Sequence, residues 1–311
     1  MSFSVQPALA QKLGYARVFV ERGGRVYYGY KNPAGSVSTD IRLNMTAANA
    51  VLQQLGLPRI QPVTQPGTAT GARAAALATL QGVWGGADAG GTEANLFRFG
   101  ADGRFFMAEA KPFLPVTREQ SGAELGWFDY DPATQRFATA LEVDSNLTSG
   151  TSHPDGNEPP LTISATAISS GGSTVATRLQ TVTTATSLVG LWALDSPTDP
   201  SVEHLAFFAN GRMMMVHHKG DPGGCLAFNE CPPGVEFASY TFDPVTGEMR
   251  AFGVLYDTNG CTGLFDNCPT AVAQGAVNTE NILLLTMAPG GQTATFLDGT
   301  VTRTLYRIAP Q

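Results

Sequence analysis

The chain has 311 residues, enough for two or three domains, and 43% of them are hydrophobic, which excludes a globally disordered protein. Only 14% are charged, and the 35 glycines and 20 prolines favour short strands joined by turns over a helical fold. The net charge of −7 and the lack of any basic run or long apolar run argue against nucleic acid, an anionic lipid surface or a membrane span.

Residues 1–60 predict a small α+β unit. Two β-rich runs flank Gly23-Gly24, which is typical of a hairpin. The segment MTAANAVLQQLGLP then predicts a helix that begins at the candidate N-cap Thr46 and ends at Gly56. Residues 61–71 are rich in Pro, Gly and Thr, so we expect a linker there.

The remainder of the chain carries one pattern twice. Gly82-Val83-Trp84 recurs further along the chain as Gly190-Leu191-Trp192. Asp131-Pro132 recurs as Asp243-Pro244 at a slightly larger spacing, and the extra residues fall in the loop that holds CLAFNEC. Collinear matches with one small insertion indicate a tandem duplication.

Each repeat, residues 72–186 and 187–311, predicts seven or eight short strands separated by turn signals. Successive strands joined by tight turns form a meander. A meander of this size hides its edges by closing into a barrel, and a β-sandwich is the alternative. We therefore predict a mainly β protein: two tandem, duplicated antiparallel barrel-like or sandwich domains preceded by the small α+β unit.

A short helix, ARAAALATL, followed by Gly-x-Trp on the first strand resembles the entry of the lipocalin-like (calycin) barrels. The resemblance implies an eight-stranded up-and-down barrel that holds a small apolar molecule. It also implies that the Trp closes one barrel end and stacks on an Arg of the last strand. The corresponding structural pairs would be Trp84 with Arg178 and Trp192 with Arg303.

The segment HLAFFANGRMMMVHH in repeat 2 predicts a hairpin. A two-residue type I′ turn at Asn210-Gly211 places His204 opposite His217 and Glu203 opposite His218. Two imidazoles at that range either bind a metal, sense pH or stand as polar groups at the strand ends. Strand alternation points Glu203 to the other face, so a third ligand is lacking and no metal site is predicted.

This register makes both faces of the hairpin apolar, so we expect both faces to be covered. One face packs on its own core, and the other meets a neighbouring repeat, the N-terminal unit, another subunit or a ligand. The first face holds Leu205, Phe207, Met214 and Val216, and the second holds Ala206, Phe208, Met213 and Met215. The candidate contact residues are Phe208, Met213, Met215, His204 and His217.

Trp127 is a further candidate contact residue. Its partner in repeat 2 is Ser239, and alternation with the inward Phe128 and Tyr130 points the indole outward. An outward Trp suits a sugar or protein contact, and packing between domains is the alternative.

All four cysteines, Cys225, Cys231, Cys261 and Cys268, lie in loops of repeat 2. Their even number predicts disulfides, with three possible connectivities, of which the local one would close two loops. Zinc sites use closer pairs than these C-x₅-C and C-x₆-C spacings. Disulfides indicate an extracytoplasmic location: periplasm, cell surface or medium. The Asp/Asn/Gly loops at 144–158 and 257–267 are interpreted as solvated turns, with calcium as the alternative.

No nucleophile elbow, metalloprotease motif or phosphate loop occurs, so no catalytic residue and no cofactor are predicted. The sequence favours an extracytoplasmic, non-enzymatic binding or assembly protein that acts through exposed apolar surfaces. Its partner would be another protein surface or a second copy of itself. Two alternatives remain open: a carrier of small apolar ligands with lipocalin-like barrels, and a secreted polymer hydrolase.

Overall fold

The computed structural model describes five strands in the first part of the chain and most of residues 70–309. The described ranges are 2–4, 16–22, 25–31, 37–38, 42–44, 70–112, 121–146, 150–151, 160–218, 232–260, 262–265 and 278–309. The chain divides into two compact units, Met1–Pro62 and Val63–Gln311, and both predicted repeats lie in the second.

The first unit contains small antiparallel sheets. Its strands are β1 (Ser2–Ser4), β2 (Ala16–Arg22), β3 (Arg25–Lys31), β4 (Val37–Ser38) and β5 (Arg42–Asn44). Strands β2 and β3 form the hairpin predicted at Gly23-Gly24, with Arg22 opposite Arg25. β4 extends that sheet, and β1 pairs with β5. The helix predicted from Thr46 lies outside the described residues.

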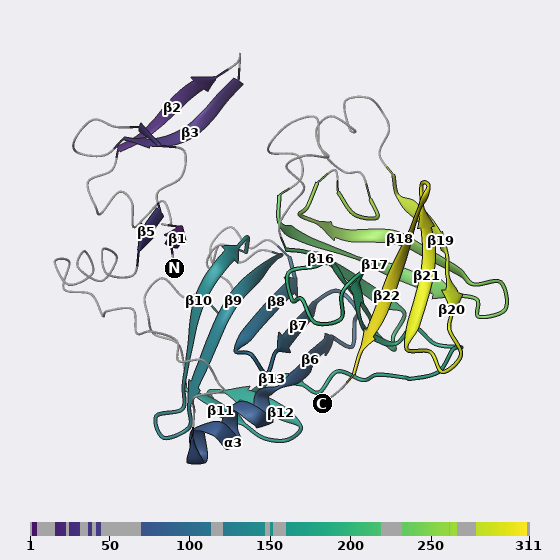
Figure 1. Cartoon of the computed structure of the whole chain (residues 1–311), viewed down its shortest axis with the longest axis horizontal. Helices are drawn as coiled ribbons and strands as arrows, with labels where there is room; N and C mark the ends of the chain where they lie inside the picture. Colours follow the sequence, from purple (N-terminus) through teal and green to yellow (C-terminus); the bar gives the residue numbers. More distant parts are fainter. Residues whose placement is uncertain are drawn as a thin grey trace. The chain divides into compact units, whose positions relative to one another are not determined.

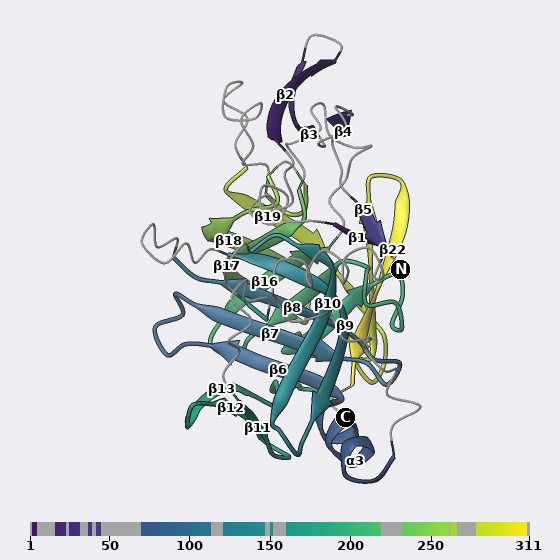
Figure 2. The same ribbon diagram turned by 90° about the vertical axis from the view of Figure 1, so that its left-hand side faces the viewer.

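The described part of the first repeat, called module 1 below, contains one helix and eight strands, and Figures 1 and 2 show their arrangement. They are α3 (Gly71–Leu80), β6 (Gly82–Ala87), β7 (Ala94–Phe99), β8 (Arg104–Ala110), β9 (Gly122–Asp131), β10 (Arg136–Asp144), β11 (Leu161–Ile163), β12 (Ala167–Ser170) and β13 (Ser173–Thr177). Strands β10-β9-β8-β7-β6 form one antiparallel sheet and β11-β12-β13 another. A bridge between Trp84 and Arg178 joins β6 to the end of β13, and Leu161 N donates to Gln135 O at the other side.

The second repeat, module 2, is a nearly closed barrel-like sheet. Its strands are β14 (Gly190–Leu194), β15 (His204–Phe207), β16 (Arg212–His217), β17 (Gly234–Phe242), β18 (Glu248–Asp257), β19 (Glu280–Leu284), β20 (Thr286–Met287), β21 (Thr293–Asp298) and β22 (Val301–Ile308). The sheet order is β19-β18-β17-β16-β15-β14-β22-β21-β20. Only Leu285 separates β19 from β20, so one bent segment supplies both ends of the sheet. The predicted mainly β, barrel-like fold is confirmed.

The predicted register of the β15–β16 hairpin is wrong by one residue. Phe207 pairs with Met213 and His204 with Val216. Phe208 N donates to Arg212 O, and Gly211, at φ +80°, closes a three-residue loop. A Gly in the left-handed region serves such a bulged loop as well as it serves a two-residue turn, so Asn-Gly alone leaves the register open.

This shift changes which side chains share a face. Leu205, Phe207, Met213 and Met215 lie in the buried core of module 2. Ala206, Phe208, Met214 and Val216 lie on the other face, so the expected outward position of Met213 and Met215 is wrong. The hairpin is nevertheless covered on both sides, as its doubly apolar pattern predicts.

Module 1 covers the outer face of the hairpin. One buried cluster joins Val83, Leu96, Phe106 and Leu125 of module 1 to Leu191, Phe208, Met214, Val216 and Phe237 of module 2. Each module also has its own core: Trp84, Phe99 and Phe128 belong to the first, and Trp192 and Met249 to the second. Three apolar layers therefore hold the second unit together: the interiors of the two modules and the interface between their outer faces.

Candidate ligand-binding site

Module 1 contains a cavity of about 220 Å³ that is partly open to solvent. Strand alternation directs the side chains of β7, β8 and β10 into it, and the end of α3 closes one side. The apolar part of its wall is formed by Leu80, Phe97, Phe99, Met107, Phe137 and Ile168. Glu109, Thr151 and Ser170 supply the polar part.

A wider hollow of about 380 Å³ lies at the ends of β6, β7 and β8. It shares Glu109 and Val175 with the smaller cavity, so these two residues stand between mouth and interior. The carboxylate of Glu109 lies 3.0 Å from Lys111 Nζ. Gly85, at φ +133°, also lines the mouth, and a Cβ there would overlap the Asn95 carbonyl.

Trp84 of β6 and Arg178, which follows β13, stack on each other beside the end of α3. The guanidinium lies 3.8 Å from the indole centroid and donates to Gln81 O at 2.5 Å and Thr79 O at 2.6 Å. Trp84 Nε1 donates to Leu80 O at 2.6 Å. The arrangement combines a cation–π contact with hydrogen bonds to the carbonyls at the C-terminal end of α3, which lack partners within the helix.

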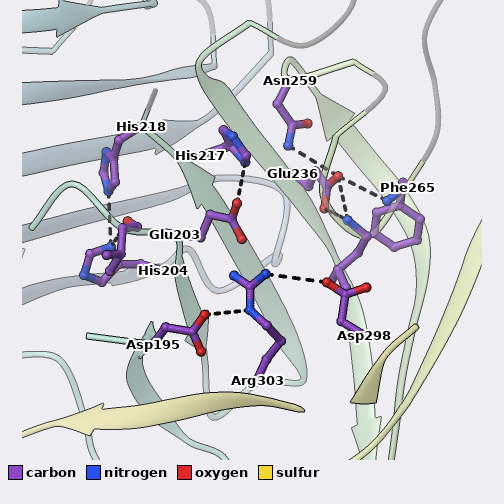
Figure 3. Close-up of polar contacts among 12 residues, drawn as sticks. Asp195, Glu203, His204, His217, His218, Glu236, Asn259, Phe265, Asp298 and Arg303 are labelled. Atoms are coloured by element: carbon purple, nitrogen blue, oxygen red, sulfur yellow. Dashed lines mark hydrogen bonds and ion pairs between the residues drawn. The ribbon is translucent and has the colours of Figure 1, made fainter. Parts of the chain in front are cut away.

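Module 2 repeats this arrangement, but with Arg307 rather than Arg303. Arg307 lies 4.0 Å from the Trp192 centroid and donates to Val189 O and Ser187 O. The expected pairing of Trp192 with Arg303 is wrong, because β22 places Arg307 opposite Trp192. Arg303 instead forms ion pairs with Asp195 at 2.6 Å and Asp298 at 3.6 Å (Figure 3).

Two buried glutamates, Glu124 and Glu236, hold aligned loops in the two modules. Glu124 accepts hydrogen bonds from the amide and hydroxyl of Thr151. Glu236 accepts from Leu264 N at 3.0 Å and Phe265 N at 3.1 Å (Figure 3). Burial raises the pKa of each carboxyl to about 8. Sequence analysis missed this pair, although the two glutamates have the same spacing as Asp131 and Asp243, which was a usable signal.

The histidines of the hairpin point to two different places. His204 lies in the interface between modules, where Arg98 Nη1 is 2.8 Å from its Nε2 and His218 Nε2 is 3.2 Å from its Nδ1. The ring of Phe106 packs against both imidazoles. The predicted pairing of His204 with His217 is therefore wrong. Sequence analysis also missed Arg98 and Phe106 as partners, because the contact joins different repeats.

His217 lies on the inner face of module 2. Its Nδ1 is 3.3 Å from Glu203 Oε1, which that face also carries (Figure 3). Within the described ranges, no group of three or more His, Cys, Asp or Glu residues is arranged to hold a metal ion. The four cysteines lie outside the described residues, so their predicted pairing stays a prediction.

Trp127 is half-buried and lies outside the cavity wall. Its Nε1 donates to Glu142 at 3.1 Å, and the Arg104 guanidinium lies 5.4 Å from its ring centroid. The indole is thus engaged by its own module, and its role as an external contact stays a prediction.

Comparison with family models, curated proteins and solved structures gave no match. Among the described residues, no helix has the length and apolar character needed to cross a membrane.

Proposed function

We propose that this protein binds a small apolar molecule in the interior of module 1. The observation that carries the proposal is the cavity of about 220 Å³ behind the Glu109–Val175 mouth. A dry cavity of roughly 150 Å³ lined by Leu, Ile and Phe is large enough to bind benzene. The cavity of module 1 has a mainly apolar wall and more room, so an apolar molecule gains contacts there that water does not provide.

The few polar groups of the wall would fix the orientation of the ligand. Glu109, Thr151 and Ser170 are the polar residues of the cavity, and Glu109 also faces the mouth. Small-molecule sites combine a mainly apolar wall with a small number of placed polar groups. The polar end of a bound molecule would therefore point toward Glu109.

A cavity-filling substitution tests this proposal. Ser170→Phe places a ring in the cavity and is expected to abolish binding of toluene, measured by saturation-transfer NMR. Ser173→Phe, at an exposed position of β13 outside the cavity wall, is the matched control and should bind as the unaltered protein does. Equal toluene signals from the two variants, or an unaltered protein that binds neither toluene nor decanoate, would contradict the proposal.

A second candidate function, assembly through an exposed apolar surface, is favoured by one observation. Phe252 of β18 and Ile282 and Leu284 of β19 lie on exposed positions of neighbouring strands, and Leu284 is 66% exposed. Light scattering on concentrated protein should then show a dimer or larger species, which Ile282→Ser with Leu284→Ser would return to a monomer. A monomer at every concentration would refute self-assembly.

The extracytoplasmic location is likewise a proposal, supported by the four loop cysteines in repeat 2. Protein purified without reductant and then denatured should show no free thiol in a colorimetric titration. Four titratable thiols would instead indicate a reducing compartment.

A further inference from the structure

We infer that the ligand of module 1 is a compound with a single aromatic ring and a short substituent. This rests on the proposed function. It follows from the duplication, because module 2 fills the equivalent space with side chains of its own, Leu264 and Phe265. The side chains that fill this space in module 2 indicate the size and shape of the ligand that fits the space in module 1.

The residues that line the cavity of module 1 and those that surround Leu264 and Phe265 in module 2 occupy equivalent positions of the repeat. Leu80, Phe97, Phe99 and Met107 in the cavity wall align with Leu188, Leu205, Phe207 and Met215 at the spacing that relates Trp84 to Trp192. Phe137 aligns with Met249 at the spacing that relates Asp131 to Asp243. These counterparts in the second module all belong to the buried cluster that includes Leu264 and Phe265.

The loops that border the two spaces also share one backbone geometry. Gly150 and Gly263 both have positive φ, +81° and +100°, and at each a Cβ would overlap the buried glutamate of its module. The residue that follows, Thr151 or Leu264, donates its amide to that glutamate. The two loops therefore approach their barrels in the same way and differ in side chains.

The side-chain difference accounts for the cavity. Leu264 is 7% exposed and Phe265 is 1% exposed, so both are enclosed by the module 2 core. Module 1 has Thr151 at the first of these positions, and Ser152 follows it in the sequence. Thr151 lines the cavity of about 220 Å³ and lacks the branched alkyl group that Leu264 places at the aligned position. A benzene-sized ring needs roughly 150 Å³, which leaves space for a short substituent directed to Glu109.

A panel of probes separates this inference from the proposed function. Toluene and 4-methylphenol are expected to bind with one molecule per chain in calorimetry or NMR titration, and decanoate is not. If decanoate binds and both ring compounds do not, the ligand class is wrong while the proposed function stands. If none of the three binds, the proposed function itself is wrong.

Exchange of the loop side chains provides the second test. Leu264→Thr with Phe265→Ser should open an equivalent space in module 2 and raise the toluene stoichiometry from one to two. Thr151→Leu, the reverse change in module 1, should weaken toluene binding at least about tenfold, and the loop is expected to tolerate it because Leu occupies this position in module 2. Circular dichroism checks that both variants fold. A folded double variant that still binds one toluene, or an unchanged affinity in Thr151→Leu, would overturn the inference.

Discussion

At the scale of single residues, the surroundings of His204 fix its protonation state. A guanidinium offers only donors, so Arg98 must donate to Nε2, and the ring proton resides on Nδ1, which donates to Val202 O at 2.8 Å. Protonation of Nε2 would remove the first bond and place two cations together in a buried interface. Burial, with contributions from His218 and Arg98, lowers the pKa of His204 well below its usual value.

The contribution of His204 to the stability of the second unit should therefore fall in acid. Because the folded pKa of His204 is depressed, its contribution is present above the unfolded value, about 6.5, and is lost as the pH falls below it. At pH 5.5 the loss reaches at most about 1.4 kcal/mol, the cost of keeping His204 neutral one unit below the unfolded pKa. Urea unfolding of the unaltered protein and of His204→Gln at pH 7.5 and 5.5 isolates this contribution: acidification should shift the free-energy difference between the two proteins by up to about 1.4 kcal/mol in favour of His204→Gln. The same pH-induced change in the two proteins would rule out His204 as the titrating group.

At the scale of elements, Glu236 joins β17 to the loop segment that carries Leu264 and Phe265. Its carboxyl accepts two backbone amides, and Asn259 Nδ2 lies 3.4 Å from it. In module 1, Glu124 joins β9 to Thr151 by accepting hydrogen bonds from its backbone amide and its hydroxyl. Backbone amides in a buried turn need acceptors, and one side chain that provides several holds the loop in place. These two glutamates, called the latch carboxyls below, thus set the positions of Leu264, Phe265 and Thr151 in their modules.

Because the pKa of Glu236 is raised, its contribution to stability changes with pH in the opposite direction from that of His204. The folded protein retains a proton on Glu236 up to a pKa of about 8, whereas the unfolded chain releases it near pH 4.5, so stability falls as the pH rises between these values. Glu236→Gln should reduce that decline by removing one of the two latch carboxyls. Glu248→Gln, in an exposed ion pair on β18, is the control and should leave the decline unchanged. Denaturation midpoints at pH 6, 7 and 8 provide the measurement.

At the scale of the whole second unit, a buried interface joins the two modules into one compact unit. Phe106 is fully buried there and packs against the imidazoles of His204 and His218, and Phe208 lies in the same cluster. The outer strand faces of small β-domains are normally exposed to solvent and polar. Here the facing outer surfaces of both modules are apolar. Each module therefore depends on the other to cover its outer face.

Removal of the Phe106 ring should uncouple the modules. Phe106→Ala is expected to cost about 3–5 kcal/mol and to divide thermal unfolding into two calorimetric transitions. Phe105→Ala is the matched control, because the neighbouring ring lies in the core of module 1 itself and its loss should chiefly destabilise that module. A Phe106→Ala protein with an unchanged melting temperature would show that the interface contributes nothing to stability.

Much of this architecture follows from local sequence. The duplication, the mainly β fold and the covering of both faces of the β15–β16 hairpin depend on strand alternation and on turn residues, which act over a few positions. The same reasoning failed where one residue of register mattered. Asn210-Gly211 suits two loop lengths, and the choice between them exchanged the faces of Met213 and Met214. Likewise, Arg303 and Arg307 share a face of β22, and only the pairing with β14 selects Arg307 for Trp192.

The sequence by itself determined that the hairpin of module 2 had to be buried on both sides, because an apolar strand face has an unfavourable free energy in water whatever the fold. Only the tertiary structure decided that module 1 covers it, since that depends on contacts between residues far apart in the chain. The candidate site has the same origin. The residues of its wall occupy positions that recur in both repeats. The cavity itself exists because one loop places Thr151 where the aligned loop places Leu264. An unfilled volume depends on how all neighbouring side chains pack, and no single residue determines it.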